Sequence, residues 1–371
     1  ANYYSVTRRR TPYLADRNNE EMGCLQSSEA KSEGENDTSE PKRKVYSWDK
    51  QEDADASEYM FENQKNVIEA KMPGKINGEQ FVIQNCEGCQ VYLFDYSATV
   101  TVDDCVGCKI FIGPSKGSVN IRDCKDCSFI VACQQFRTRD CKRLEVFLCC
   151  NTQPIIESST AMRFACFQYN YPELEGQFDS AGLSIFNNNW SSIHDFTPAS
   201  DIQTWSLLPH DSVVSAYVPF PPVDDFPDIE VSADSDSSIV PLTSGCRRKQ
   251  SDESCLVVFY PGPDARNNVK SYLREVKLKT SYQLVQTKEV RMTIEDAQRV
   301  FGMEHDMTNI QQGAVIGLEI NGDDCVLVCN EMLSTLCEGK SKSELAFVST
   351  SKETAAKNID NFYNFVDMTM S

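Results

Sequence analysis

The sequence FVIQNCEGCQVYLF at residues 81–94 decides the fold of this chain, because its pattern recurs further along. Within it, two short strands with alternating apolar residues flank a Cys-x-x-Cys corner. The pattern returns 19 residues later at 100–112, again at 119–131, and imperfectly at 136–148, where Leu144 replaces the second cysteine. Short apolar strands and tight polar corners at a fixed spacing indicate a parallel β-helix, in which each repeat is one coil.

The alternation of these strands also predicts which side chains face outward. If Phe136 points into the coil, then Gln135, Arg137 and Arg139 point out side by side. The column of Arg137 contains uncharged polar side chains in the earlier coils, such as Asn120. The ordinary role of such an arginine is that of a solvated charge. The alternative is that its own stack leaves the guanidinium unneutralised, so that it is presented to a phosphate on another molecule.

Arg139 has different surroundings from Arg137 in this prediction. Its column contains Asp103 and Arg122, and Asp140 follows it in the sequence. Because carboxylates at such positions pair with guanidinium groups, we expect Arg139 to brace the strand and to have a structural role.

The cysteines of the chain, 17 in all, allow two interpretations. The odd number and the lack of an opening signal-peptide pattern lead us to expect free thiols in a reducing compartment. Zinc is the alternative, because two Cys-x-x-Cys pairs about 15–20 residues apart are a recognised zinc spacing. The repeats supply more pairs than one ion needs, however, and Cys141 lacks its partner. We therefore expect a ladder of buried thiols that pack as small apolar groups, and no metal ligands.

Composition and charge narrow the classes of function. The chain has 371 residues, which predicts two folded domains, and its 40% hydrophobic and 25% charged content is ordinary for a globular protein. Its net charge of −19 opposes a phosphate backbone, so we expect no nucleic-acid partner. It contains no run of 18 apolar residues that could form a transmembrane helix.

A lipidation pattern lies near the beginning of the sequence, at Met22–Ser27, MGCLQS. If translation starts at Met22, Gly23 becomes the N-terminal residue and fits the pattern for myristoylation. Cys24 is then the expected site of palmitoylation, and the second acyl chain makes the membrane anchor durable. The preceding 21 residues are expected to be an upstream extension of the gene.

The composition divides the chain into four parts. We expect a disordered leader and acylated tether at 1–45, the β-helix domain at 46–200, a connector at 201–253 and a second domain at 254–371. In the second domain the pattern predicts a buried strand at 255–259, a helix near 265–276, paired strands near 281–293, a helix capped by Thr293 and a strand at 314–319. This alternation predicts a small α+β fold.

A family resemblance covers most of the chain from Met22 onward. Residues 134–141, QQFRTRDC, resemble the signature of the tubulin cofactor C domain. The wider pattern resembles the retinitis pigmentosa 2 family, through residues 46–49, 149–157, 171–174 and 193–198, the Cys-x-x-Cys coils, the Met-Gly-Cys start and the C-terminal domain. The resemblance implies a right-handed parallel β-helix, followed by a smaller ferredoxin-like α+β domain that resembles nucleoside diphosphate kinase.

The same resemblance implies a function. Members of the family stimulate GTP hydrolysis by Arf-like small GTPases, which identifies Arg137 as the expected arginine finger and Gln135 as its supporting residue. Glu157 and Phe196 match family positions that contact the GTPase. The chain has no Walker-type loop, so GTP and Mg²⁺ are expected to come with the partner. The alternative is a non-catalytic GTPase effector or a tubulin-folding scaffold.

The implied location is the cytoplasmic face of the plasma membrane, the ciliary base and the cilium, where the family acts in the transport of lipidated proteins. We expect no self-contained active site in the C-terminal domain. Nucleoside diphosphate kinases need a phosphate-accepting histidine in a Gly/Ser-rich motif, and none of His194, His210 and His305 has such neighbours. The chain is therefore expected to be a GTPase activator and not an enzyme by itself.

Overall fold

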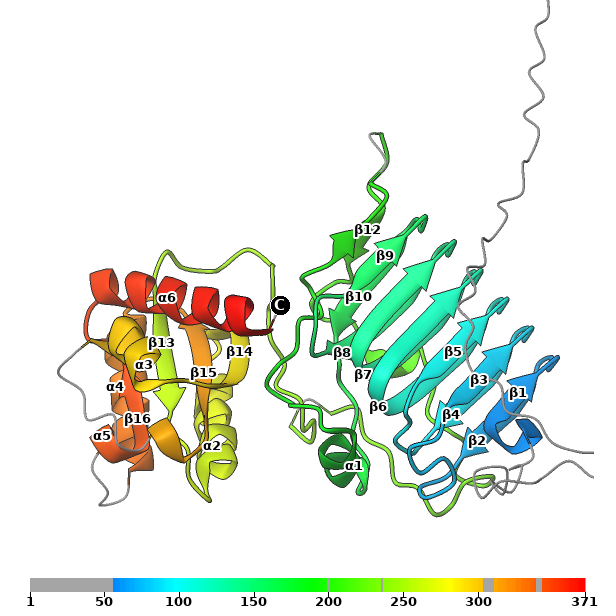
Figure 1. Cartoon of the computed structure of the whole chain (residues 1–371), viewed down its shortest axis with the longest axis horizontal. Helices are drawn as coiled ribbons and strands as arrows, with labels where there is room; N and C mark the ends of the chain where they lie inside the picture. The colour runs from blue at the N-terminus through cyan, green and yellow to red at the C-terminus, as the bar shows by residue number, and fades with distance from the viewer. Residues whose placement is uncertain (1–55, 199–200, 235, 303–309, 338–341, 371) are drawn as a thin grey trace, which may run out of the picture. The chain divides into compact units, whose positions relative to one another are not determined.

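A computed structural model of the chain describes residues 56–198, 201–234, 236–302, 310–337 and 342–370. The expected leader and tether at residues 1–45, with Gly23 and Cys24, lie outside the described residues. A β-helix domain and an α+β domain follow one another along the described chain (Figure 1). No helix in the described ranges is long and apolar enough to cross a bilayer.

The first domain is a parallel β-helix, as predicted, and its strands form two stacks. A short helix, η2 (Ala56–Tyr59), precedes them. The first stack consists of β1 (Met60–Glu62), β3 (Phe81–Gln84), β5 (Val100–Asp103), the second halves of β6 (Lys109–Arg122) and β7 (Ser128–Arg139), β9 (Ile155–Glu157) and β11 (His194–Asp195). The second stack consists of β2 (Ile68–Lys71), β4 (Gln90–Leu93), the first halves of β6 and β7, β8 (Glu145–Cys150), β10 (Met162–Cys166) and β12 (Trp205–Leu207).

Left-handed backbone at fixed positions turns the chain at the corners. The residue before the first cysteine of each corner has a positive φ, which is 53° at Asn85, 50° at Asp104, 52° at Asp123 and 55° at Asp140. A second column of positive φ, at Gly88, Gly107, Asp126 and Arg143, precedes the second cysteine or its replacement. Gly, Asn and Asp adopt this conformation at lower cost than other residues, which explains why they occur at the corners.

The interior of the coils is apolar, and the predicted direction of the side chains is confirmed. The inward columns Phe81/Val100/Val119/Phe136 and Ile83/Val102/Ile121/Thr138 are buried. The corner cysteines, Cys86, Cys89, Cys105, Cys108, Cys124, Cys127 and Cys141, belong to the same core. Their thiols lie within hydrogen-bond distance of backbone carbonyls, as Cys105 Sγ does of the Asp103 oxygen at 3.3 Å. These thiols are free and buried, and thus pack as small core side chains.

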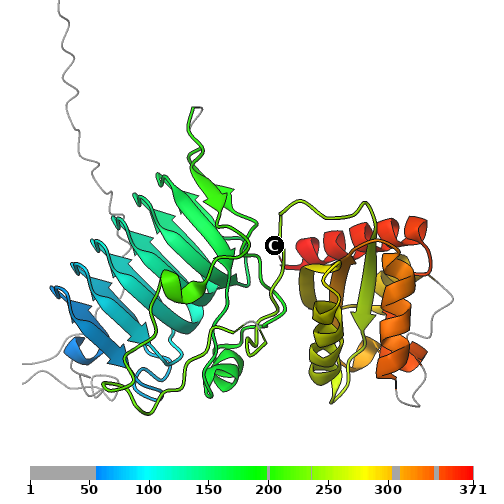
Figure 2. The ribbon, with the colours of Figure 1, turned by 180° about the vertical axis from the view of Figure 1, so that it is seen from behind.

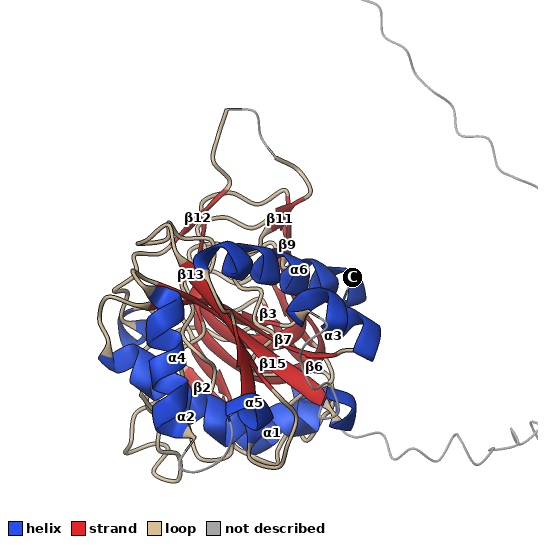
Figure 3. Cartoon of the chain, turned by 90° about the vertical axis from the view of Figure 1, so that its left-hand side faces the viewer, coloured by secondary structure: helices blue, strands red, loops and turns tan. Residues whose placement is uncertain are grey.

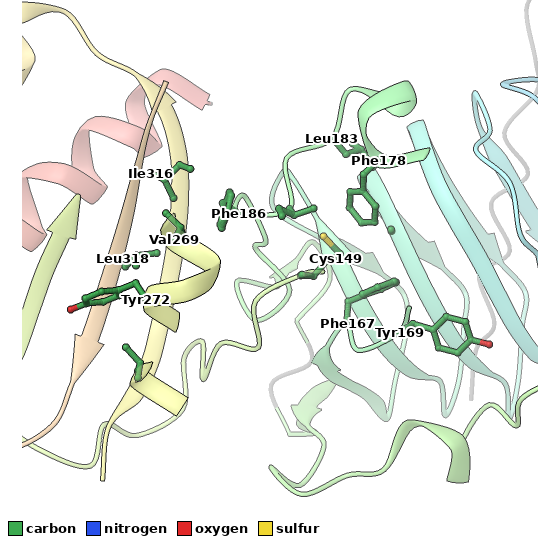
Figure 4. Packing of buried hydrophobic residues seen from close by; sticks show 14 of the residues in the cluster. Cys149, Phe167, Tyr169, Phe178, Leu183, Phe186, Val269, Tyr272, Ile316 and Leu318 are labelled. Carbon is green, nitrogen blue, oxygen red and sulfur yellow. The ribbon is translucent and has the colours of Figure 1, made fainter. Parts of the chain in front are cut away.

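The outer side of the second stack, which we call the covered face, is also apolar. Its outward side chains Tyr92, Phe94, Phe111, Ile130 and Phe147 are all buried. They pack against residues that follow the last coils. These include Tyr169 and Tyr171, and also Phe178, which lies on α1 (Leu174–Ala181). Figure 2 shows this side of the β-helix with chain running across it, and Figure 4 shows Phe167 and Phe178 near Cys149.

The expected connector at residues 201–253 contains structure of its own. Its strand β12 pairs with β10 in the second stack, and a short helix, η3 (Val214–Ala216), follows it. The hydroxyl of Tyr92 donates to the Pro219 carbonyl oxygen at 2.8 Å, so the proline-rich part is fixed to the covered face. This stretch therefore contributes a strand and part of the cover to the β-helix.

The second domain has the ferredoxin-like order of elements that the resemblance implied. Its described elements are β13 (Ser254–Phe259), α2 (Ala265–Leu278), β14 (Gln283–Arg291), α3 (Ile294–Phe301), η4 (Ile310–Gln312), β15 (Ala314–Asn321), α4 (Cys325–Leu336), α5 (Lys342–Leu345), β16 (Ala346–Val348) and α6 (Lys352–Met370). The strands form an antiparallel sheet in the order β14-β15-β13-β16. In Figure 3, α2 and α4 lie on one side of these strands and α3 and α6 on the other.

Two sequence predictions in this domain had different outcomes. The cap at Thr293 is confirmed, because its hydroxyl accepts from the Asp296 N–H in a capping box. The prediction of paired strands near 281–293 is wrong. This region forms one strand, β14, which pairs with β15 and has an irregularity between Leu284 and Gln286 that breaks the alternation.

Candidate functional site

The register of the first stack brings the predicted site residues onto one outer surface, which we call the open face. Arg137 lies between Asn120 on β6 and Ile155 on β9. In the next outward column, Arg139 lies between Arg122 and Glu157. Residues two apart on a strand point to the same side, so these columns face solvent together.

Arg137 is exposed, and its guanidinium has an unusual environment among the arginines of the open face. Its Nη2 donates to Gln135 Oε1 at 3.4 Å, and no carboxylate in the described residues lies within ion-pair distance of it. Arg122 is instead paired with Asp103, with 2.7 Å between Arg122 Nε and Asp103 Oδ1. That hydrogen bond raises the pKa of the Arg122 guanidinium. On the open face, Arg137 is thus the cation that its own described neighbours leave unneutralised.

Arg139 pairs with Asp140, with 3.2 Å between Nε and the nearer carboxylate oxygen. Both side chains are about half exposed, at 57% and 49%. An exposed pair of this kind contributes little to stability. Its consequence for the site is electrostatic, because Asp140 offsets the charge of Arg139 beside Arg137.

Backbone contacts hold the strand that carries Arg137. The N–H and the hydroxyl of Thr152 both donate to the Gln134 carbonyl oxygen, at 3.1 and 2.8 Å. The buried hydroxyls of Thr138 and Ser159 lie 3.3 Å apart on the inner side. The guanidinium is therefore carried by a strand that its neighbours hold in place.

A shallow hollow of about 490 Å³ lies on the open face. Its lining includes Asn120, Arg137, Arg139, Ile155, Glu157 and Phe196. The hollow is lined by cationic, anionic and apolar groups together, which suits contact with a protein surface better than enclosure of a small molecule. A second, much smaller hollow of about 30 Å³ is lined by Trp190, His210 and Thr243 among others, and has room for about one water molecule.

Phe196 and Glu157 end the column of Arg139. The backbone N–H of Phe196 donates to the Ile156 carbonyl oxygen at 2.9 Å, which continues the ladder beyond Asp195. The phenyl ring is 61% exposed, and it meets the ring of His194 edge-to-face at 4.8 Å. An exposed phenylalanine beside an apolar Ile155 is a feature of interaction surfaces.

The residues alone did not predict two members of this surface. Ile155 and His194 follow in the column of Arg137, but the irregular spacing after residue 148 hid their register. The repeat does predict Ser118, whose hydroxyl lies 3.3 Å from Gln135 Oε1, in the same outward column as Gln135. Of the histidines considered for kinase chemistry, His194 and His210 belong to the β-helix part, and His305 lies outside the described residues.

Comparisons with known proteins identify the family of this chain. The family described as "Tubulin binding cofactor C" matches residues 78–196, which include Gln135, Arg137, Glu157 and Phe196. Protein XRP2 of Xenopus laevis is 53% identical over 358 residues, which are 94% of this chain and 99% of that protein. The chain belongs to the XRP2 family. This confirms the resemblance to the retinitis pigmentosa 2 family that the sequence motifs indicated.

More distant relatives of this XRP2 family member match only part of it. Tubulin-specific chaperone C of Homo sapiens is 31% identical over 154 residues, 41% of this chain and 44% of that protein. Among solved structures, Tubulin Binding Cofactor C from Leishmania major has a TM-score of 0.27 with 24% identity and covers 31% of this chain and 81% of its own. A nucleoside diphosphate kinase family protein from Babesia bovis has a TM-score of 0.25 with 14% identity. It covers 30% of this chain and 87% of its own.

Proposed function

We propose that this protein is a GTPase-activating protein for an Arf-like small GTPase, and that Arg137 is its arginine finger. The observation that supports this most is the exposed, unneutralised guanidinium on a firmly held strand. Arg122 and Arg139 beside it are paired with their own carboxylates. Arg137 has only the amide oxygen of Gln135 as a described partner and can exchange it for a phosphate.

The chemistry follows from where charge develops during GTP hydrolysis. In the transition state, negative charge spreads over the oxygens of the transferred phosphoryl group. A guanidinium placed there in trans stabilises this charge, and such fingers raise turnover by roughly 10³–10⁵-fold. The partner supplies GTP, Mg²⁺ and the attacking water. Gln135 supports the finger by holding the guanidinium through its amide oxygen.

Docking of the partner uses the rest of the open face. Phe196 offers an exposed aromatic ring, and Glu157 offers a carboxylate in the same column. A GTPase that sets an apolar pocket over Phe196 and a basic group against Glu157 would have its nucleotide near Arg137. Arg139 has no part in the finger chemistry of this proposal, because Asp140 offsets its charge.

The membrane tether follows from the Met-Gly-Cys pattern. If translation starts at Met22, Gly23 is myristoylated and Cys24 palmitoylated, and the two acyl chains anchor the protein to a membrane. That this membrane is the cytoplasmic face of the plasma membrane, at the ciliary base and in the cilium, is proposed from the resemblance to the retinitis pigmentosa 2 family. There it acts in the transport of lipidated proteins. Mass spectrometry of the N-terminus from cells tests this, since an unmodified residue upstream of Met22 would contradict it.

The decisive experiment is single-turnover GTP hydrolysis by each purified Arf-like GTPase, loaded with GTP and Mg²⁺, with and without the full chain. Arg137→Ala should abolish stimulation while binding to the GTPase largely survives, because the finger acts in the transition state. Arg163→Ala is the matched control. Arg163 is paired with Glu145 on the second stack, away from the open face. The Arg163→Ala variant should therefore stimulate hydrolysis like the wild type. Equal stimulation by Arg137→Ala would remove the finger from the mechanism.

A second function, as a non-catalytic effector or tubulin-folding scaffold, is favoured by the relative named Tubulin-specific chaperone C. The β-helix would then bind a GTPase or tubulin through the open face without accelerating hydrolysis. Stable binding with unchanged turnover in the same assay selects this alternative.

A further inference from the structure

The amide of Gln135 lies where two outward side chains meet. Its Oε1 accepts from Arg137 Nη2 at 3.4 Å and from Ser118 Oγ at 3.3 Å. Ser118 is the register partner of Gln135 on the neighbouring strand. Both donors therefore approach the same oxygen, one from the same strand and one from the coil before.

The other end of this amide is free for a partner. Gln135 Nε2 makes no hydrogen bond to any residue in the described ranges, and the side chain is half-buried on the open face. The guanidinium of Arg137 can only donate, so a flipped amide would set its own N–H groups against it. The oxygen is thus held toward Arg137, and the hydroxyl of Ser118 adds a second contact to the same atom.

We propose that Ser118 is a positioning residue, whose hydroxyl fixes the Gln135 amide so that one end holds Arg137 and the other donates to an oxygen of the partner's GTP. This inference rests on the proposed GTPase-activating function. Ser118 touches neither nucleotide nor guanidinium and acts through Gln135. Without the hydroxyl, Gln135 Oε1 loses one of its two described hydrogen bonds. The amide then no longer holds Arg137 and its own N–H groups in one fixed arrangement.

Close packing fixes the backbone next to Ser118. The N–H of Gly117 donates to the Ala98 carbonyl oxygen at 2.8 Å. A Cβ on Gly117 would lie 2.8 Å from that oxygen and 3.1 Å from Thr99 Cγ2, so only glycine fits there. The backbone before Ser118 is therefore pressed against the preceding coil, and the hydroxyl of Ser118 reaches Gln135 from this fixed strand.

The same column offers a matched control. Thr99 occupies the equivalent outward position one coil earlier, and its hydroxyl makes no described hydrogen bond to Gln135. Both residues are half-buried. A general effect of removing a hydroxyl from this column should therefore be the same at Thr99 and at Ser118, whereas the proposed role belongs to Ser118 alone.

The experiment measures single-turnover GTP hydrolysis by an Arf-like GTPase that the wild-type chain stimulates, over a range of chain concentrations. We expect Ser118→Ala and Ser118→Val to lower the maximal stimulated rate about three- to tenfold, with an unchanged half-saturating concentration. Ser118→Thr keeps the hydroxyl in the shape of valine and should restore the rate to within about twofold. Thr99→Ala should behave like the wild type.

Each outcome bears on a different claim. A wild-type rate in both Ser118→Ala and Ser118→Val would overturn the positioning role and leave the proposed function intact. Equal losses in the threonine and valine variants, or a change only in the half-saturating concentration, would also overturn it, because the hydroxyl would not be what matters for the rate. If the wild-type chain stimulates none of the Arf-like GTPases, the proposed function itself is rejected.

Discussion

The two outer faces of the β-helix share one backbone repeat and differ in almost everything else. Outward side chains on the covered face are aromatic or aliphatic and are fully buried by later parts of the chain, as with Tyr92 and Phe111. Outward side chains on the open face are mostly polar or charged, as with Asn120 and Arg137, and these two are not buried. Strand alternation alone cannot produce this difference, because the inward columns behind both faces are equally apolar.

The difference separates stability from interaction. Aromatic residues bury large areas and dominate the energetics of a core, so the covered face contributes strongly to the folding of the β-helix. The open face contributes little, because its charges are exposed and mostly paired with one another. A residue such as Arg137 can therefore be retained for a partner at little cost to the fold.

The largest expected effect is on the covered face. Phe111 stacks on Tyr169 at 4.4 Å between ring centroids and is fully buried, so Phe111→Ala should lower the free energy of unfolding by about 3–5 kcal/mol. Arg137→Ala, its control on the open face, should change it by less than about 0.5 kcal/mol. Urea denaturation followed by circular dichroism measures both. Similar losses in the two variants would break the distinction between the faces.

The second expected effect is on the open face. Asn120→Asp places a carboxylate in the column of Arg137, in register with it, and so gives it the kind of partner that Arg122 and Arg139 have. A charged hydrogen bond of about 1.5–3 kcal/mol that must be broken before the finger reaches the phosphate should slow stimulated hydrolysis about 10- to 100-fold.

The controls for this variant are its stability and its neutral counterpart. Asn120→Asp should unfold at the wild-type urea concentration, and Asn120→Ala should stimulate almost normally, because it adds no charge. Full activity in Asn120→Asp would mean that an unneutralised guanidinium is not the property that matters at this site.

Much of the open face could be predicted from the sequence, because one rule governs it. Alignment of the repeats on their corner cysteines sets the register, with a spacing of 19 residues between the first three corners and 17 before the last. Strand alternation then places Phe136 inside and Arg137 outside, as the structure confirms. The pairing of Arg139 with Asp140 followed from the same argument. The roles of Glu157 and Phe196 in binding came from the family resemblance alone and stay predictions.

The covered face could not be predicted in the same way. Its outward residues, such as Tyr92, are apolar like the inward ones, so alternation gave no contrast between the two sides of that strand. Its cover comes from residues that are distant in sequence, including Phe178 on α1 and the proline-rich part near Pro219. In the second domain, the prediction of two paired strands near 281–293 fails because the irregularity between Leu284 and Gln286 interrupts the alternation of β14.

The smallest expected effect concerns the ion pair beside the finger. A double-mutant cycle with Asp103→Ala and Arg122→Ala should give a coupling of about 0.2–1 kcal/mol in urea denaturation, because both side chains are partly exposed. Asp103→Ala also leaves Arg122 as a second unneutralised guanidinium on the open face. It should nevertheless fail to rescue Arg137→Ala in the hydrolysis assay, since Arg122 lies one coil and one column away. Rescue would show that free positive charge on this face is sufficient, and that the position of Arg137 next to Gln135 is not what makes it the finger.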